Sequence, residues 1–344
     1  MSDLINDKRT RNANIELLRI FFMFVILFHH FFSHGLNIGK IGSEEVPINP
    51  VNNINASLCL LTHFGVIGFM FISSYYGINL RISKACKLWV QLLFYSLIIF
   101  IGYSLFYHNF SIYQFIPALL PLRIWWFVKY YFIVMLLSPI INEGVTVVNK
   151  KTFLFTIVSV GVVLYFSRFI MKESSFNLDL LLYIYILGRY LRHYPIYWLE
   201  KHCVIILFVN SIILFAIPLL FLAFHISNPL RWLWSSYNIL VLIEAISCFY
   251  TFLHHKPFIK RSININISSN VLAVYLITDH PIIRKLLWSN TNGVTYIYNS
   301  TGSLFVVIAV LFVVFGICLV IDKVRQFIMK PIDRALLRLD SLLT

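Results

Sequence analysis

The stretch ELLRIFFMFVILFHHFF, from Glu16 to Phe32, decides the fold class of this chain. It is apolar enough to cross a bilayer, yet it carries charged residues near one end, Glu16 and Arg19, and two histidines near the other, His29 and His30. Windows of about 20 apolar residues are typical of membrane-spanning helices, and ionisable groups within them are costly and usually functional. The stretch therefore predicts a first membrane helix that contains part of a functional site.

The composition of the whole chain indicates an integral membrane protein. Its 344 residues are 59% hydrophobic and 12% charged, and the mean hydropathy is +0.81, whereas soluble domains average about 25% charged residues. The net charge of +14 lies in short clusters between apolar blocks, without interleaved aromatics, so no nucleic-acid partner is predicted. Five scattered cysteines form no CxxC pair, so neither a disulfide nor a metal site is expected.

Ten apolar windows predict an all-α polytopic bundle of about ten transmembrane helices, surrounded by lipid. An even number of helices places both termini on the same side of the membrane. The windows are 15–34, 57–80, 87–107, 124–142, 152–171, 176–191, 202–224, 236–253, 268–288 and 303–322.

The distribution of Lys and Arg predicts that both termini are cytoplasmic, because cytoplasmic segments carry an excess of these residues. With the N-terminus inside and Arg19 counted as part of the first helix, 19 of the 28 cations fall in cytoplasmic segments: Lys8, Arg9, Arg11, Arg81, Lys84, Lys87, Lys150, Lys151, Arg189, Arg192, Lys201, Lys256, Lys260, Arg261, Lys323, Arg325, Lys330, Arg334 and Arg338. Eight fall outside: Lys40, Arg123, Lys129, Arg168, Lys172, Arg231, Arg284 and Lys285.

No soluble module is apparent, so residues 1–344 are predicted to form a single membrane domain. The longest outer loop, 35–56, is rich in Gly, Asn and Pro and is too short for a second domain. The end of the chain, 323–344, is predicted to be a basic amphipathic cytoplasmic tail at the membrane surface.

Arg19 and His30 are eleven residues apart, which on an α-helix is about three turns, roughly 16 Å, and nearly the same face. His29 points away from that face, which also carries Glu16, Met23 and His34. A guanidinium binds phosphate in a bidentate manner, and a neutral imidazole can act as a general base on a hydroxyl. The spacing is consistent with a relay across the membrane. The alternative is two independent interfacial residues, with Arg19 snorkelling and paired to Glu16.

Several motifs resemble the acyltransferase type 3 family of polytopic membrane enzymes. NIELLRIFFMFVILFHHF resembles the family's opening motif, GFMFISSYYGINLR (68–81) its GVDLFFVLSGFL pattern, and WWFVKYYFIVMLLSP (125–139) its Trp-Phe … Pro segment. VYLITDHPIIRKLLW (274–288) is similar to its YLIH segment. Two positions depart from the family: Ser74 replaces a usual glycine, and His280 is displaced by two positions.

The resemblance implies an O-acyltransferase that moves an acyl group, by default acetyl, from cytoplasmic acetyl-CoA to a hydroxyl of an extracytoplasmic or lipid-linked glycan. By the same resemblance, Arg19 and His30 match the family's essential Arg-X10-His pair, as CoA contact and catalytic base. It also implies the localisation, a multi-pass protein of the cell membrane, here the bacterial plasma membrane, acting on a surface polysaccharide.

Other polar residues at membrane depth are second candidates. Ser73, Arg81 and Lys84 are predicted to contact the CoA donor, although helix packing and topology explain them equally well. Trp126, Tyr130 and His280 are predicted to contact the acceptor; an aromatic belt and a satisfied interfacial histidine are the alternatives. Pro281 is expected to break the ninth helix beside a site.

Four further ionisable residues are predicted to support the site: Glu16, His34, Glu244 and Asp279. The carboxylate of Glu244 lies in mid-membrane and is expected to pair with an Arg, Lys or His of the bundle. No GxSxG, HExxH, P-loop or Rossmann pattern occurs, so direct transfer with a histidine base is favoured over an acyl-serine intermediate.

Two other classes of protein are weaker alternatives. A carrier or flippase for a lipid-linked sugar or organic anion would also have about ten helices with intramembrane charges, but no related halves are visible. A polysaccharide polymerase usually has a large outer loop, and the longest loop here has about twenty residues.

Overall fold

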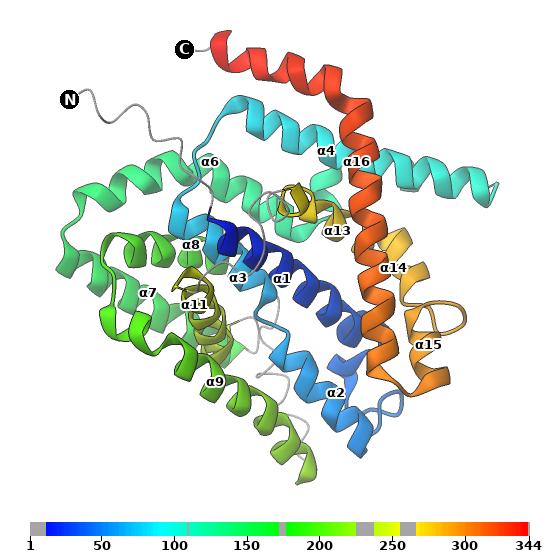
Figure 1. Cartoon of the computed structure of the whole chain (residues 1–344), viewed down its shortest axis with the longest axis horizontal. Helices are drawn as coiled ribbons and strands as arrows, with labels where there is room; N and C mark the ends of the chain where they lie inside the picture. The colour runs from blue at the N-terminus through cyan, green and yellow to red at the C-terminus, as the bar shows by residue number, and fades with distance from the viewer. Residues whose placement is uncertain (1–11, 109, 172–176, 225–236, 255–265, 343–344) are drawn as a thin grey trace.

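The computed structural model describes residues 12–108, 110–171, 177–224, 237–254 and 266–342, and all regular secondary structure in these ranges is helical. The elements (Figure 1) are α1 Ala13–His30, η1 Phe31–Gly35, η2 Ile38–Lys40, α2 Pro50–Leu61, α3 Gly65–Tyr76, α4 Ile82–Phe106, α5 Ile112–Leu119, η3 Pro121–Arg123, α6 Trp126–Val147, α7 Lys150–Met171, α8 Leu178–His193, α9 Tyr197–Ala223, α11 Ile239–His254, α13 Val271–Thr278, α14 Pro281–Leu287, α15 Val294–Thr301 and α16 Leu304–Leu342.

Within the described ranges, seven helical segments are long and apolar enough to cross a membrane: Ala13–Gly35, Pro50–Tyr76, Ile82–Phe106, Trp126–Val147, Lys150–Ser167, Tyr197–Ala223 and Leu304–Arg338. Two shorter apolar helices, Ile239–His254 and Asn266–Thr278, fall where the eighth and ninth spans were expected. The all-α polytopic class is thus confirmed, whereas the described part of the chain contains fewer than the ten full spans expected. Some cations of the charge count lie outside the described residues: Lys8, Arg9, Arg11, Lys172, Arg231, Lys256, Lys260 and Arg261.

Three of the predicted helices are interrupted. The first continues past His30 as a π-helical turn to Gly35. The second begins earlier than expected, at Pro50, and is divided into α2 and α3. The ninth breaks at Asp279 and His280, directly before Pro281, which opens α14. Proline has no amide hydrogen and disfavours the helical conformation of the residue before it, and here Pro281 starts a new helix, so the break predicted at this position is confirmed.

Helix α1 lies inside the bundle, where α3, α11, α13 and α16 pack around it (Figure 1). The contact with α3 is close because α3 carries two glycines on the side that faces α1. A β-carbon at Gly68 would collide with the ring of Phe22, and one at Gly65 would approach Ile26 to 2.9 Å. Phe22 is fully buried as a result. This packing fixes α1, and therefore the polar residues along it.

Ser74, which replaces the usual glycine of the family motif, packs against a glycine of another helix. Its hydroxyl donates to the carbonyl of Phe71 over 2.7 Å, and the side chain is fully buried. A β-carbon at Gly188 on α8 would collide with it. The small residue that allows close approach thus lies on α8 rather than α3, and the two helices still pack tightly.

The predicted cationic partner of Glu244 is wrong. The carboxylate accepts hydrogen bonds from Asn210 Nδ2 at 2.6 Å and from Ser211 Oγ at 2.5 Å, both on α9. Glu244 is 1% exposed. An amide and a hydroxyl can satisfy a buried carboxyl as hydrogen-bond donors, so this group joins α9 to α11.

The expected tail is the continuation of α16, which runs without interruption through Pro331. The start of the tail is anchored to the rest of the protein. Asp322, directly before the tail, accepts hydrogen bonds from the hydroxyl of Tyr95 on α4 at 2.6 Å and from Arg325 Nε at 2.7 Å. Location of the remaining turns at a membrane surface stays a prediction.

Candidate active site

The two ends of α1 carry separate polar clusters, one around Arg19 and one around His30. The expected shared face is supported by their neighbours, because Met23 and Ile26 between them line one small void together with Tyr275, and the Tyr275 ring centroid is 6.4 Å from that of His30. The Arg19 side chain remains 33% exposed. The helix thus connects a partly exposed cation with an imidazole near its other end.

His29 has a different environment from His30, as the helical spacing predicts. Its Nδ1 lies 3.1 Å from the carbonyl oxygen of Cys59 and 3.3 Å from Thr62 Oγ1. Both partners belong to the α2 region, so His29 connects α1 to the neighbouring helix. This hydrogen bonding gives His29 a structural contact, so His30 is the candidate histidine of the site.

His30 lies in a group of polar residues from two segments of the chain. Its ring centroid is 5.1 Å from that of His34. His34 Nε2 lies 3.9 Å from Asp279 Oδ1, and Arg284 Nη1 lies 3.4 Å from the same carboxylate oxygen. Asp279 is 3% exposed. The predicted residues His30, His34 and Asp279 are therefore brought together, and Arg284 is an addition that spacing alone did not identify.

The Nδ1 atom of His30 is buried and makes no hydrogen bond with any described residue. A buried polar atom without a partner is costly, by about 1–3 kcal/mol. Such atoms are uncommon in folded proteins and frequently belong to functional sites. A neutral imidazole nitrogen can accept a proton from a hydroxyl group that binds beside it.

The same residues also form a potential metal site. One donor atom each from His30, His34 and Asp279 lie within 4.8 Å of one another, the only such group of three found among the described residues. The guanidinium of Arg284 compensates the charge of Asp279 at 3.4 Å and interacts electrostatically with both imidazoles. Because the Arg284 guanidinium already neutralises the one carboxylate of this group, the donor set fits a positively charged metal ion poorly.

At the other end of α1, Arg19 interacts with an acidic residue and an aromatic ring. Its Nη1 lies 3.8 Å from Glu16 Oε2, and Glu16 also accepts a hydrogen bond from Ser268 Oγ. The phenol of Tyr76 interacts electrostatically with Arg19 and with Arg192. The pairing with Glu16 expected from the sequence is present, but Glu16 is buried and partly engaged by Ser268.

Two arginines of α8, counted in the sequence only as topology signals, lie at this same end. Arg189 donates to the carbonyl of Tyr75 at 3.2 Å, and the Arg192 guanidinium lies over the Tyr75 ring, 5.1 Å from its centroid. Gly77 has a φ of +76°, and a β-carbon there would lie 2.7 Å from Arg189. The spacing of three residues on one helix face was the sequence signal available for this pair.

A narrow apolar void separates the two polar ends of α1. It has a volume of about 10 Å³, enough for one water-sized probe, and is lined by Met23, Ile26, Val66, Phe69, Phe127, Leu272 and Tyr275. These residues come from α1, α3, α6 and the segment that contains α13. The interior beside α1 is therefore incompletely packed between Arg19 and His30.

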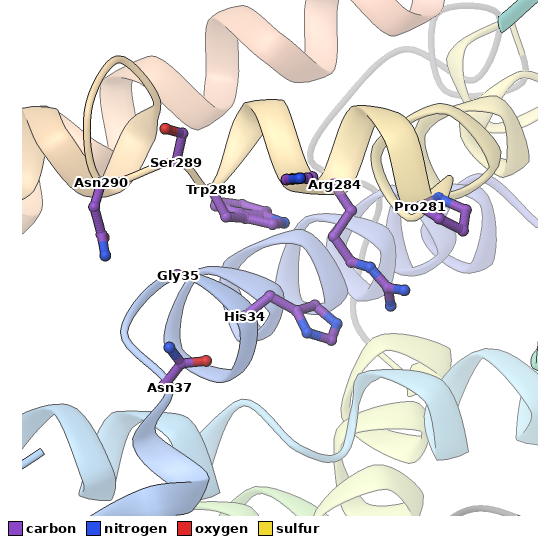
Figure 2. A pocket seen from close by; sticks show the side chains of 9 residues that line it. His34, Gly35, Asn37, Pro281, Arg284, Trp288, Ser289 and Asn290 are labelled. Atoms are coloured by element: carbon purple, nitrogen blue, oxygen red, sulfur yellow. The ribbon is translucent and has the colours of Figure 1, made fainter. Parts of the chain in front are cut away.

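A larger cavity of about 440 Å³ opens next to His34. Figure 2 shows His34 and Arg284 pointing into the space between the end of the first helix and α14, with Trp288 beside them. The lining residues are His34, Gly35, Asn37, Pro281, Arg284, Lys285, Trp288, Ser289 and Asn290. We call this space the outer cavity. It has the size of an ordinary small-molecule site.

The three residues predicted to contact the acceptor, Trp126, Tyr130 and His280, do not line the outer cavity. Trp126 and Tyr130 are neighbouring rings on α6, 6.4 Å apart between centroids. It is the fully buried Trp125 that lies 5.7 Å from the His280 ring. His280 Nδ1 accepts from the amide of Ile282 at 3.3 Å and so caps α14. This contact favours the alternative of a satisfied structural histidine.

The remaining residues expected at the donor site lie near the ends of α3 and α4. Ser73 is half-buried on α3, three residues before Tyr76. Arg81 precedes the first residue of α4, and Lys84 lies in its first turn; both are exposed. Contact of these three with a donor stays a prediction.

Together the apolar helices and the buried polar group on α1 define a multi-pass membrane protein with a site inside its bundle. The family model described as "Acyltransferase domain" matches residues 12–323. The chain belongs to this acyltransferase family, as its motifs indicated, and it is a membrane acyltransferase. Neither a curated protein nor a solved structure matches the chain.

Proposed function

We propose that this protein transfers an acyl group, acetyl by default, from cytoplasmic acyl-CoA to a hydroxyl of an extracytoplasmic or lipid-linked glycan, in the bacterial plasma membrane. The observation that carries the proposal is the arrangement along α1: a partly exposed guanidinium at one end, a buried imidazole nitrogen at the other that has no hydrogen-bond partner among the described residues, and a small apolar void between them.

In this proposal Arg19 binds a phosphate of CoA, and Arg189 and Arg192 add positive charge at the same end. Arg189 and Arg192 of α8 contact Tyr75 of α3, and the next residue, Tyr76, lies within electrostatic range of both Arg192 and Arg19. Guanidinium groups form bidentate hydrogen bonds with phosphate, and the phosphates of CoA carry several negative charges. The acyl end of the donor extends along Met23 toward His30.

His30 acts as the general base. It takes the proton of the acceptor hydroxyl while that oxygen attacks the thioester carbonyl; the carbon–sulfur bond then breaks, and the thiolate of CoA leaves and accepts the proton from the imidazolium. The products are the acyl ester and free CoA, so no redox partner is required. His34 lies beside His30, and its Nε2 is 3.9 Å from the carboxylate of Asp279, which is paired with Arg284.

The direct test uses purified protein in lipid vesicles with radiolabelled acetyl-CoA and a glycan extract from the source cells. We expect label on the glycan and one free CoA thiol for each ester formed. A protein that neither binds nor consumes acetyl-CoA would contradict the proposal, and transport of a lipid-linked sugar or an organic anion should then be measured.

Filling the void is expected to stop transfer without touching a polar residue. Val66→Phe places a ring in the void between Arg19 and His30, and even a small misplacement of reacting groups can lower the rate about 100-fold. The same change at Val163, which is 67% exposed on α7, is the control and should leave the rate unchanged. Equal rates for Val66→Phe and wild type would show that the donor does not use this void.

Removal of divalent metal ions is expected to leave the rate unchanged, because Arg284 already balances the charge of Asp279. The initial rate of CoA release is measured before and after dialysis against EDTA. Loss of activity that returns with added Zn²⁺ would instead assign a metal ion to His30, His34 and Asp279.

A further inference from the structure

The outer cavity carries more positive than negative charge. Arg284 and Lys285 both line it, and no carboxylate does. Asp279 lies behind the surface and is 3% exposed, where Arg284 compensates it. Lys285 is exposed and forms no ion pair with a described residue. An adjoining cavity of about 720 Å³ shares Gly35, Asn37 and Asn290 with this one; its one acid, Glu45, is paired with Lys40 at 2.6 Å.

The rest of the lining has the chemistry of a sugar site. Two amides and a hydroxyl, from Asn37, Asn290 and Ser289, can both donate and accept hydrogen bonds. The indole of Trp288 provides an apolar face, and its Nε1 is buried without a hydrogen-bond partner among the described residues. Figure 2 shows this ring between Arg284 and Ser289. A neutral sugar would use the amides and the indole but would leave the Lys285 ammonium without an ionic partner among the described residues.

The cavity also lies within reach of the proposed base. His34 lines it, and the ring of His34 is 5.1 Å from that of His30 between centroids. A sugar in the outer cavity can therefore place an anionic group beside Lys285 on α14 and a hydroxyl on the side of His34.

We propose that the outer cavity is the acceptor site and that it selects a sugar residue carrying an anionic group, a carboxylate or a phosphate, close to the hydroxyl that receives the acyl group. This inference rests on the proposed acyl transfer for its role but not for the binding itself. Lys285 and Arg284 recognise the anion, and Asn37 and Asn290 orient the ring.

Binding to the protein in lipid nanodiscs, without acetyl-CoA, tests the inference separately from the reaction. The probes are methyl glucuronoside, glucose 1-phosphate and neutral methyl glucoside. We expect at least one of the two anionic probes to bind at least fivefold more tightly than methyl glucoside. The anionic probe that binds more tightly identifies the anion as a carboxylate or a phosphate. The preference should decrease as salt is raised, because ions screen exposed charges.

Four variants locate the anion. Lys285→Gln should weaken binding of the anionic probe about fivefold, the range expected of an exposed charge pair, and Lys285→Arg should restore it. Arg123→Gln removes another outer cation, which lies in η3 away from the cavity lining, and should change nothing. Asn37→Gly removes an amide at a residue with a φ of +51°, a conformation that glycine adopts freely; it should weaken all three probes equally.

Equal binding of neutral and anionic probes, or a Lys285→Gln variant that binds like wild type, would overturn the inference, even if acetyl transfer to neutral sugars is found. Conversely, charge-selective binding by a protein that consumes no acetyl-CoA would support the site and contradict the proposed function. The two failures are therefore distinguishable.

Discussion

Replacing His30 with alanine is expected to lower acyl transfer by about 10²–10⁴-fold, the usual contribution of a positioned acid–base group. The imidazole Nδ1 is buried and makes no hydrogen bond to the described residues, so its loss should disturb the fold little. The rate of CoA release in reconstituted vesicles, with donor and acceptor saturating, measures the effect. The loss should appear in kcat, because the base acts in the chemical step.

The neighbouring histidine provides the matched control. His29 is hydrogen-bonded to Cys59 and Thr62, so His29→Asn should alter thermal stability but change kcat far less than His30→Ala. If His29→Asn lowered kcat more than His30→Ala, His29 rather than His30 would be the general base. A normal rate of acyl transfer by the His30→Ala variant would show that His30 is not the general base.

Replacing Arg19 with alanine is expected to raise the acyl-CoA concentration needed for half-maximal rate by at least about tenfold. A hydrogen bond to a charged group contributes about 1.5–3 kcal/mol, and Arg19 is proposed to make such bonds to a phosphate. Arg19→Lys should restore only part of the affinity, because an ammonium group cannot form the bidentate contact. Titration of acyl-CoA against the initial rate measures both variants.

The control for Arg19 is an exposed cation near the other end of the chain. Arg334 lies on the exposed part of α16, so Arg334→Ala removes the same charge without a proposed donor contact and should leave the titration unchanged. If Arg19→Ala lowers kcat at saturating donor and leaves the half-maximal concentration unchanged, Arg19 does not bind the donor.

The sequence was sufficient for features that depend on one helix at a time. The shared direction of Arg19 and His30, the separate role of His29 and the break before Pro281 all follow from helix geometry and from the missing amide hydrogen of proline. The structure contains the break and the hydrogen bonds of His29. These features involve residues within a few turns of each other, where periodicity is informative.

Features that depend on contacts between distant segments were not predictable. Glu244 was expected to need a cation, but Asn210 and Ser211 of another helix satisfy it. Arg192 was counted as a topology signal, although it lies over Tyr75. Trp125 rather than Trp126 lies beside His280, and Trp125 is the extended residue that precedes the first turn of α6. Which face meets which neighbour is set by packing across the bundle.

The central claim is that the donor enters at the Arg19 end of α1 and reacts at the His30 end. The most direct measurement adds radiolabelled acetyl-CoA to sealed membrane vesicles of opposite orientation that contain the protein, with His30→Ala vesicles as the blank. We predict that inverted vesicles, whose cytoplasmic face is outward, consume acetyl-CoA and acquire label on the glycan of the opposite face, whereas right-side-out vesicles do not. Equal consumption by right-side-out vesicles, or label that stays on the side of the donor, would contradict this account.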